Sequence, residues 1–186
     1  MAADIDLGVV ERARLGAQDD LEALLVLVWP DAYRLAYAVV GRRDAAEDAA
    51  QDACLAACRS IGALRDAAAF RVWFARIVVR EASAVARRVR ASAPIETVLD
   101  SPGTPHDDAQ RIDLWRALAT LAPALRTVVV LRYFEDLSSR EIGAVLGVPA
   151  ATIRFRLAVA LRRLRPLLDD GARTVAPIPE VRSHAC

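Results

Sequence analysis

Apolar residues in the first half of the chain recur every three or four positions, a spacing that predicts helices rather than strands. One such segment covers residues 21–40, where Pro30 predicts an interruption or bend and Gly41 predicts the end. Two more helices are expected over residues 44–60 and 68–90, the second with its aromatic side chains on one stripe. No segment shows the alternation and hairpin turns of strands, so this half is expected to be all-helical.

The second half carries the pattern of a helix, a short turn and another helix. Ser138 followed three residues later by Glu141 is a capping box, which predicts a helix over residues 139–146. Gly147 predicts the end of that helix, and Pro149 the first turn of a last one. This is a helix-turn-helix. The residues expected to pack its two helices together are Ile142, Leu146, Val148, Ile153 and Leu157.

A proline-containing stretch of weak periodicity, residues 91–112, separates the halves and is typical of a linker. The sequence therefore predicts an all-α fold of two small helical domains joined by a flexible linker, the second domain containing the helix-turn-helix. The expected boundaries are 1–90 for the first domain, 91–112 for the linker, 113–168 for the second domain and 169–186 for a mobile tail. Fully extended, such a linker reaches roughly 70 Å, about two turns of DNA.

Charge is distributed unevenly along the chain, although the total of +1 is nearly neutral. All 25 basic residues are arginines. The predicted first domain is balanced and the linker carries −3, whereas residues 113–165 carry +5. The neutral total therefore conceals a basic domain, as expected for a protein that binds nucleic acid. A second basic run lies in the helix over residues 68–90, which contains Arg71, Arg76, Arg80, Arg87, Arg88 and Arg90 against one acid, Glu81.

The rotation of 100° per residue predicts which side of the last helix meets DNA. The core side is expected to hold Ile153, Leu157, Ala160, Leu161 and Leu164. The opposite side holds Thr152, Phe155, Val159 and Arg162, with Arg154 and Arg156 at the flanks. Because the start of the second helix of a helix-turn-helix reaches base edges, Ala151, Thr152 and Phe155 are the candidates for base readout. Phe155 could instead pack on a neighbouring helix or a protein partner.

The sequence shows no clear pattern of a catalytic site, a metal site or a cofactor site. The histidines, His106 and His184, fall in the predicted linker and tail, and no glycine-rich phosphate loop is present. Acids such as Glu47 and Asp48 fit the start of a helix better than acid–base chemistry. Cys54 and Cys58, one helical turn apart, could form a redox pair, but small buried thiols are the commoner outcome.

Signals for export or membrane insertion are not apparent. The longest uninterrupted apolar stretch, residues 23–30, is far shorter than the roughly 20 residues that span a bilayer. The first residues are acidic, unlike the basic start of a secretory signal. The sequence therefore predicts a cytoplasmic protein without a membrane-inserted segment.

Two segments resemble the extracytoplasmic-function sigma factors of bacterial RNA polymerase. They are AEDAAQDACLAA followed by FRVWFARI, and LSSREIGAVLGVPAATIRFRLAVALRRLR preceded by LAPALRTVVVLRYFEDLS. Both halves, in this order across a short linker, are typical of the smallest class of sigma factors. The resemblance implies a non-enzymatic protein that binds core RNA polymerase and directs transcription initiation. A helix-turn-helix regulator that acts without polymerase is the alternative.

The resemblance also implies roles for individual residues. Asp48 and Gln51 correspond to the surface that docks on core polymerase. The loop over residues 62–69 and the helix after it correspond to the part that opens minus-ten DNA and captures an unpaired base, which assigns single-stranded promoter DNA to Arg76, Arg80, Arg87 and Arg88. The second domain corresponds to the reader of duplex minus-thirty-five DNA, which assigns that element to Arg140, Ala151, Thr152, Arg154, Phe155, Arg156 and Arg162. Members of this family are often held by an anti-sigma factor.

The sequence departs from the family pattern at a few of these positions. Cys54 and Cys58 stand where larger side chains are usual, and Arg80 and Ala84 replace the common Asn and Asp of the minus-ten helix. Phe155 stands where a small polar residue is more common. These differences bear on which promoter is recognised and leave the expected architecture unchanged.

Overall fold

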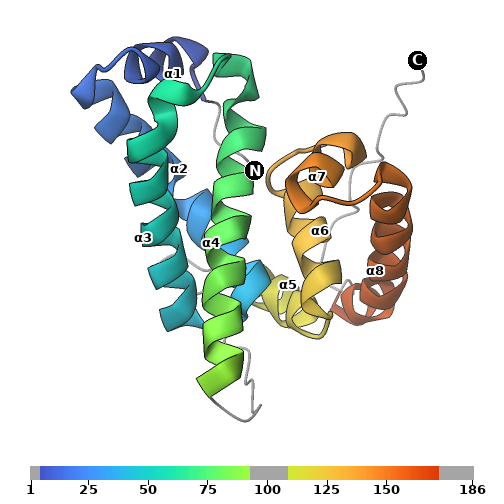
Figure 1. Ribbon diagram of the computed structural model, residues 1–186. Helices are drawn as coiled ribbons and strands as arrows, with labels where there is room; N and C mark the ends of the chain where they lie inside the picture. Colours follow the sequence, from blue (N-terminus) through green and yellow to red (C-terminus); the bar gives the residue numbers. More distant parts are fainter. Residues whose placement is uncertain (1–4, 93–108, 172–186) are drawn as a thin grey trace, which may run out of the picture.

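The structure, a computed structural model, describes residues 5–92 and 109–171, and every regular element in these ranges is a helix (Figure 1). The first domain contains α1 (Leu7–Arg14), α2 (Gln18–Val40), α3 (Arg43–Ser60), the 3-10 turns η1 (Ile61–Ala63) and η2 (Ala67–Ala69), and α4 (Phe70–Ser92). The second contains α5 (Ala109–Ala119), α6 (Pro123–Tyr133), α7 (Ser139–Leu146) and α8 (Ala150–Gly171). The predicted all-α fold is confirmed.

The ends of the predicted linker are helical. Helix α4 continues to Ser92 and α5 begins at Ala109, so both enter the stretch that the sequence assigned to the linker. Helix α8 likewise continues to Gly171, beyond the predicted end of the second domain. The remainder of the linker and the tail lie outside the described residues, and the division into domains stays a prediction.

Helix α3 owes its central place in the first domain to alanine. Its buried face consists of Ala45, Ala46, Ala49, Ala50, Ala53 and Ala57, none more than 6% exposed. This face packs against α2 and α4. Because alanine adds only a methyl group, the three helix backbones approach closely and the core is thin although the apolar fraction of the chain is high.

Helix α2 runs without interruption through Pro30, which corrects the interruption predicted there, although Gly41 ends the helix as expected. Pro30 is exposed, so the Val26 carbonyl that loses its helical donor lies on the solvent side. Gly41 has φ of 82°, a left-handed conformation that glycine adopts without strain. By length and composition α2 could cross a membrane, yet it packs against α1, α3, α4 and α6 as a core helix.

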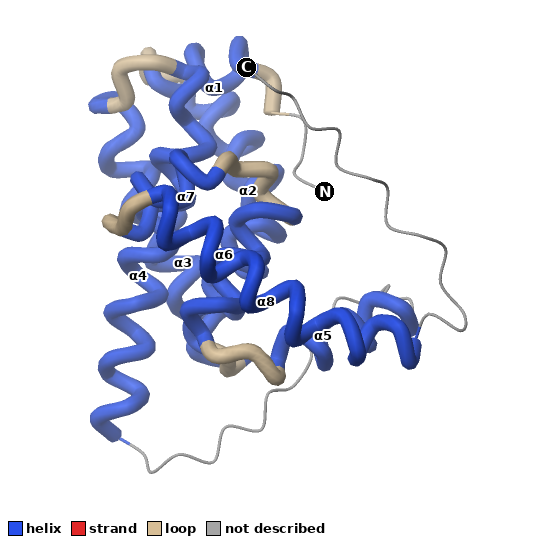
Figure 2. The backbone as a smooth tube through the Cα atoms, turned by 90° about the vertical axis from the view of Figure 1, so that its right-hand side faces the viewer, coloured by secondary structure: helices blue, strands red, loops and turns tan. Residues whose placement is uncertain are grey.

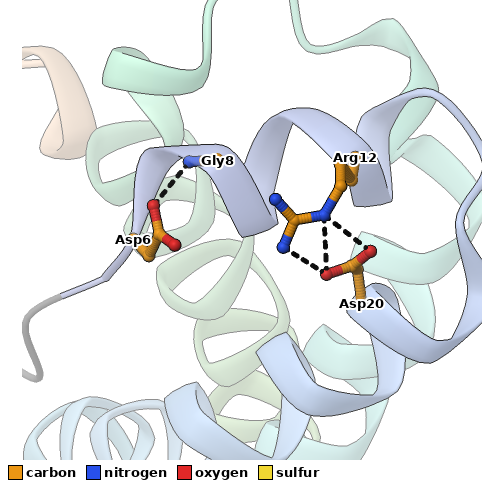
Figure 3. Close-up of polar contacts among 4 residues, drawn as sticks. All are labelled: Asp6, Gly8, Arg12 and Asp20. Atoms are coloured by element: carbon orange, nitrogen blue, oxygen red, sulfur yellow. Dashed lines mark hydrogen bonds and ion pairs between the residues drawn. The ribbon is translucent and has the colours of Figure 1, made fainter.

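Helix α1 was not predicted, because its eight residues show too short a pattern to stand out. The Asp6 side chain accepts a hydrogen bond from the Gly8 amide at 2.8 Å and so caps its start (Figure 3). Arg12 forms an ion pair with Asp20 at the start of α2, also at 2.8 Å (Figure 3). This pairing lowers the pKa of the Asp20 carboxyl. Val10 and Ala13 cover the core beneath.

The two domains pack against each other, a contact that the sequence did not predict. Helix α6 lies between α2 and α8, and α7 packs on α4 (Figures 1 and 2). The rings of Tyr37 on α2 and Trp115 on α5 meet edge to face, with centroids 5.7 Å apart. Both side chains are almost fully buried, so the apolar cores of the two domains form one continuous cluster.

Candidate nucleic-acid interface

The helix-turn-helix has the geometry that its sequence predicts. The Ser138 hydroxyl accepts a hydrogen bond from the Glu141 amide, and the Glu141 carboxylate accepts one from the Ser138 amide, which completes the capping box. These bonds lower the pKa of Glu141. Gly147 ends α7 with φ of 68°, and the chain turns by 105° into α8. A side chain at Gly143 would meet the Val148 carbonyl oxygen at 2.7 Å, so the turn requires glycine to pack this closely.

The start of α8 presents a polar and basic face to solvent. Ala151, Arg154, Phe155 and Arg162 are exposed, while Thr152 and Arg156 are partly so. On the opposite side Ile153, Ala160 and Leu164 are buried. The rotational prediction therefore holds for these residues, and α8 has an open side long enough to enter a DNA major groove.

Two apolar residues of α8, Leu161 and Phe155, are exposed. Leu161 was predicted to face the core but is 42% exposed. It lies about 80° around the helix from Ile153, at the edge of the buried arc, since each residue adds about 100°. Phe155 is 69% exposed, so it does not pack on a neighbouring helix of the described chain. An aromatic ring held in solvent beside two arginines is available to a partner.

Helix α4 carries the second basic surface. Arg76, Arg80, Arg87 and Arg88 are exposed, while Val78, Ala82 and Val85 on the same helix are buried. Arg80 pairs with Glu81 at 2.7 Å and Arg88 approaches Asp52 on α3 at 3.8 Å. Such exposed pairs contribute little, about 1 kcal/mol at most, and are readily exchanged for phosphate.

Arg71 departs from this basic surface. The sequence placed it in the same basic run, but the structure turns it toward the second domain, where it donates a hydrogen bond to the Glu135 backbone carbonyl. A count of charges along α4 does not distinguish an arginine that faces solvent from one that contacts the second domain. Arg71 belongs to the latter group because the second domain packs beside it.

The outward face of α3 combines acidic and polar side chains with one exposed apolar residue. Asp48 and Gln51 are exposed, as predicted from the sequence, and Asp52 shares their face. Asp48, Gln51 and Asp52 also line an open polar groove toward Arg88 of α4. Leu55, one turn after Gln51, is 56% exposed and extends this face toward the end of the helix. Leu55 lies four residues after Gln51 and therefore on the same face of the helix, and this spacing could have identified it from the sequence.

Cys54 and Cys58 are free thiols on the half-buried flank of α3. Burial, with a smaller effect of Cys58, raises the pKa of Cys54 to about 11. We expect iodoacetamide to alkylate Cys54 at pH 8 on the order of a hundredfold more slowly than a free peptide thiol, because only the thiolate reacts. Peptide mass spectrometry over time measures both rates, with a short cysteine peptide as the comparison. Alkylation of Cys54 at the free-thiol rate would favour the redox hypothesis.

Comparisons with known proteins decide the family. The family model described as "Sigma-70 region 2" matches residues 27–92, and that described as "Sigma-70, region 4" matches residues 111–164. RNA polymerase sigma factor SigV of Bacillus subtilis is 32% identical over 137 residues, which are 73% of this chain and 82% of SigV. The chain belongs to the extracytoplasmic-function class of the sigma-70 family. It is therefore a promoter-recognising RNA polymerase sigma factor, and the regulator that works without polymerase is not favoured.

Other relatives of this sigma factor agree in length and shape. RNA polymerase sigma factor CarQ of Myxococcus xanthus is 32% identical over 173 residues, 90% of this chain and 99% of CarQ. A solved structure of the sigma factor RpoE of Bartonella quintana, in complex with the anti-sigma factor NepR, superposes with a TM-score of 0.67 at 26% identity, covering 81% of this chain and 97% of that one. The complex of CnrH with the cytosolic domain of CnrY superposes at 0.63 and 22% identity, covering 89% and 97%, and shows the fold alone.

Sigma factors are regulators without catalytic activity of their own. Within residues 5–92 and 109–171, no group of three or more histidine, cysteine or acidic side chains is placed to hold a metal ion.

Proposed function

We propose that the sigma factor divides its work between its domains, the first docking on core polymerase and opening minus-ten DNA, the second reading minus-thirty-five DNA. The observation that carries this proposal is the presence of three exposed surfaces of different charge, one acidic on α3 and two basic on α4 and α8. A basic surface attracts phosphate and an acidic one repels it, so DNA favours α4 and α8 and leaves α3 to a protein.

The proposed polymerase surface is the face of α3 that contains Asp48 and Gln51. Leu55 adds an exposed apolar side chain one turn after Gln51. Protein interfaces commonly combine an apolar anchor with neighbouring polar side chains, and this face has that composition. We therefore add Leu55 to the residues proposed to contact core polymerase.

The proposed minus-ten surface is the exposed side of α4. Arginine can both pair with phosphate and stack on an unpaired base, which suits a strand that has been separated from its partner. The four residues assigned to this surface are Arg76, Arg80, Arg87 and Arg88, all exposed.

The proposed minus-thirty-five surface is the open side of α8. Arg154 and Arg156 grip phosphates, while Ala151, Thr152 and Phe155 face the base edges. The exposed Phe155 ring suits contact with a thymine methyl group, a nonpolar feature of the major groove. Arg140 of α7 and Arg162 of α8 extend the phosphate contacts on either side.

A protein inhibitor and a cytoplasmic location complete the proposal. The RpoE structure is a complex with an anti-sigma factor. This complex supports an anti-sigma partner for the present chain. A protein that acts on RNA polymerase and chromosomal promoters must share their compartment, which supports a cytoplasmic location.

Asp48→Ala is expected to weaken association with core RNA polymerase by about tenfold, a loss of about 1.4 kcal/mol, because it removes a charge from the proposed contact. Binding of the full chain to a minus-thirty-five duplex should be unchanged, since α8 is untouched. Titration of labelled core enzyme and of labelled duplex measures the two affinities.

Asp19→Ala is the matched control, an exposed acid of α2. If Asp48→Ala bound core enzyme as tightly as this control, the assignment of the α3 face would be wrong. If the unchanged chain bound duplex DNA tightly but never bound core enzyme, the division of work between the domains would be wrong as a whole.

A further inference from the structure

The side of α8 that is proposed to face DNA is apolar at its centre. Phe155 is 69% exposed, and Ala151 and Ala158 beside it are also exposed. Thr152 and Val159, which both carry methyl groups, are partly exposed. Figure 1 shows α8 at the outer edge of the second domain, so this side of the helix is open. A base contact made here is therefore made through carbon atoms.

The charged side chains of α8 lie to either side of Phe155. Arg154 and Arg156 are one residue away in each direction, so each points about 100° around the helix from the ring. When a helix lies in the major groove, side chains at that angle meet the walls of the groove, where the phosphates are. The side chain between them meets the base edges on the floor. The arginines therefore position the helix, and Phe155 is left to contact the bases.

Side chains that read bases by hydrogen bonds are scarce on this helix. Purines are commonly recognised by Asn, Gln or Arg, each of which pairs with two groups on one base edge. From Ala150 to Gly171, α8 contains no asparagine or glutamine. Within one turn of Phe155, the hydrogen-bonding side chains are Thr152 and the two flanking arginines. The donors and acceptors of the base edges thus find few partners at this point of the helix.

The feature of DNA that suits such a surface is the 5-methyl group of a pyrimidine. This apolar group projects into the major groove from thymine and is absent from cytosine. A 5-methylcytosine presents the same methyl group at the same place. Burial of one such carbon atom changes affinity by about fourfold, which is enough to distinguish one base from another.

On the basis of the function proposed above for the second domain, we propose that α8 recognises the minus-thirty-five element through a pyrimidine 5-methyl group that lies against Phe155. Thymine supplies this methyl group in unmodified DNA. 5-Methylcytosine supplies it as well, because few side chains here read the amino or keto group that distinguishes the two bases. Methylation of a cytosine at this position therefore raises the affinity of the sigma factor for the promoter.

Replacement of single thymines by deoxyuridine tests the proposal, because uracil differs from thymine only by the methyl group. The probe is a fluorescent duplex with the sequence that the full chain enriches from a random pool, and anisotropy measures its affinity. At one thymine of this duplex, deoxyuridine should weaken binding by about fourfold. When cytosine takes that position, paired with guanine, its methylation should strengthen binding by about fourfold.

Phe155→Ala removes the proposed partner of the methyl group. This variant should bind the thymine and deoxyuridine duplexes with equal affinity, and it should fold normally because the ring that it removes is exposed. Leu161→Ala is the matched control, since it removes another exposed apolar side chain from α8. It should keep the difference in affinity between the two duplexes.

Three results would overturn the proposal. They are an enriched sequence in which no thymine responds to deoxyuridine, a response that persists in Phe155→Ala, and equal affinity for the cytosine and 5-methylcytosine duplexes. Replacement of both Arg154 and Arg156 by Ala distinguishes these results from failure of the proposed function. If that change did not weaken binding to the enriched duplex, α8 would not lie on DNA at all. Weaker binding without any response to deoxyuridine would overturn the methyl contact alone.

Discussion

Replacement of both Arg154 and Arg156 by Ala is expected to reduce affinity for minus-thirty-five DNA by about 100-fold. Each change removes a proposed phosphate contact of about 1–2 kcal/mol, and the plot of log affinity against log salt concentration should become shallower by about 1.8. Fluorescence anisotropy with a labelled duplex between 50 and 200 mM salt measures both quantities. The loss should be similar for related and unrelated sequences, because phosphate contacts carry little sequence information.

Arg165→Ala provides the control for this pair. It removes the same charge from an exposed position on α8, but about three turns beyond Arg154. Its affinity and salt dependence should stay close to those of the unchanged chain. Equal losses in both variants would indicate attraction by overall charge, and no loss in either would mean that the start of α8 does not lie on DNA.

The largest effect on stability is expected for Ala50→Phe in α3. Ala50 is fully buried on the face that packs against α2 and α4, and an aromatic ring has no room between helices spaced for a methyl group. Overpacking of this kind should lower the free energy of unfolding by about 3 kcal/mol. The melting temperature, followed by circular dichroism, should fall by roughly 10 °C.

Glu47→Phe isolates the packing effect, because it places the same ring on the same helix at an exposed position. Its melting temperature should stay within about 2 °C of the unchanged chain, since exposed substitutions seldom change stability by more than about 0.5 kcal/mol. Equal melting temperatures for the two variants would show that the alanine face of α3 is not closely packed.

Local signals in the sequence predicted local structure well. Ser138 and Glu141 determine the start of α7 through bonds between residues three positions apart, and Gly147 determines its end through its own φ. The buried side of α8 followed from rotation alone, apart from Leu161 at its edge. Each of these features depends on residues of one helix and its ends, which is the range over which such a pattern carries information.

Features that depend on contacts between residues far apart in the sequence were not predicted. An analysis of periodicity places charged side chains in solvent. Arg126 and Arg71 instead form hydrogen bonds to residues 88 and 64 positions away in the sequence. For this reason the contact between the domains was not predicted. The polymerase and DNA residues rest instead on resemblance to a family, since exposure shows which side chains are available and not which partner meets them.

The exposed side chains at the start of α8 touch little of the protein that carries them. Phe155, Ala151 and Arg154 are exposed to solvent, while Ile153 and Ala160 are buried and Leu157 packs against the core from the opposite side of the helix. Mutations at the exposed positions can therefore alter which promoters are recognised at almost no expense in folding. Specificity and stability are separable along this one helix, and gene duplication followed by changes at a few positions could direct a copy of the protein to a different set of genes.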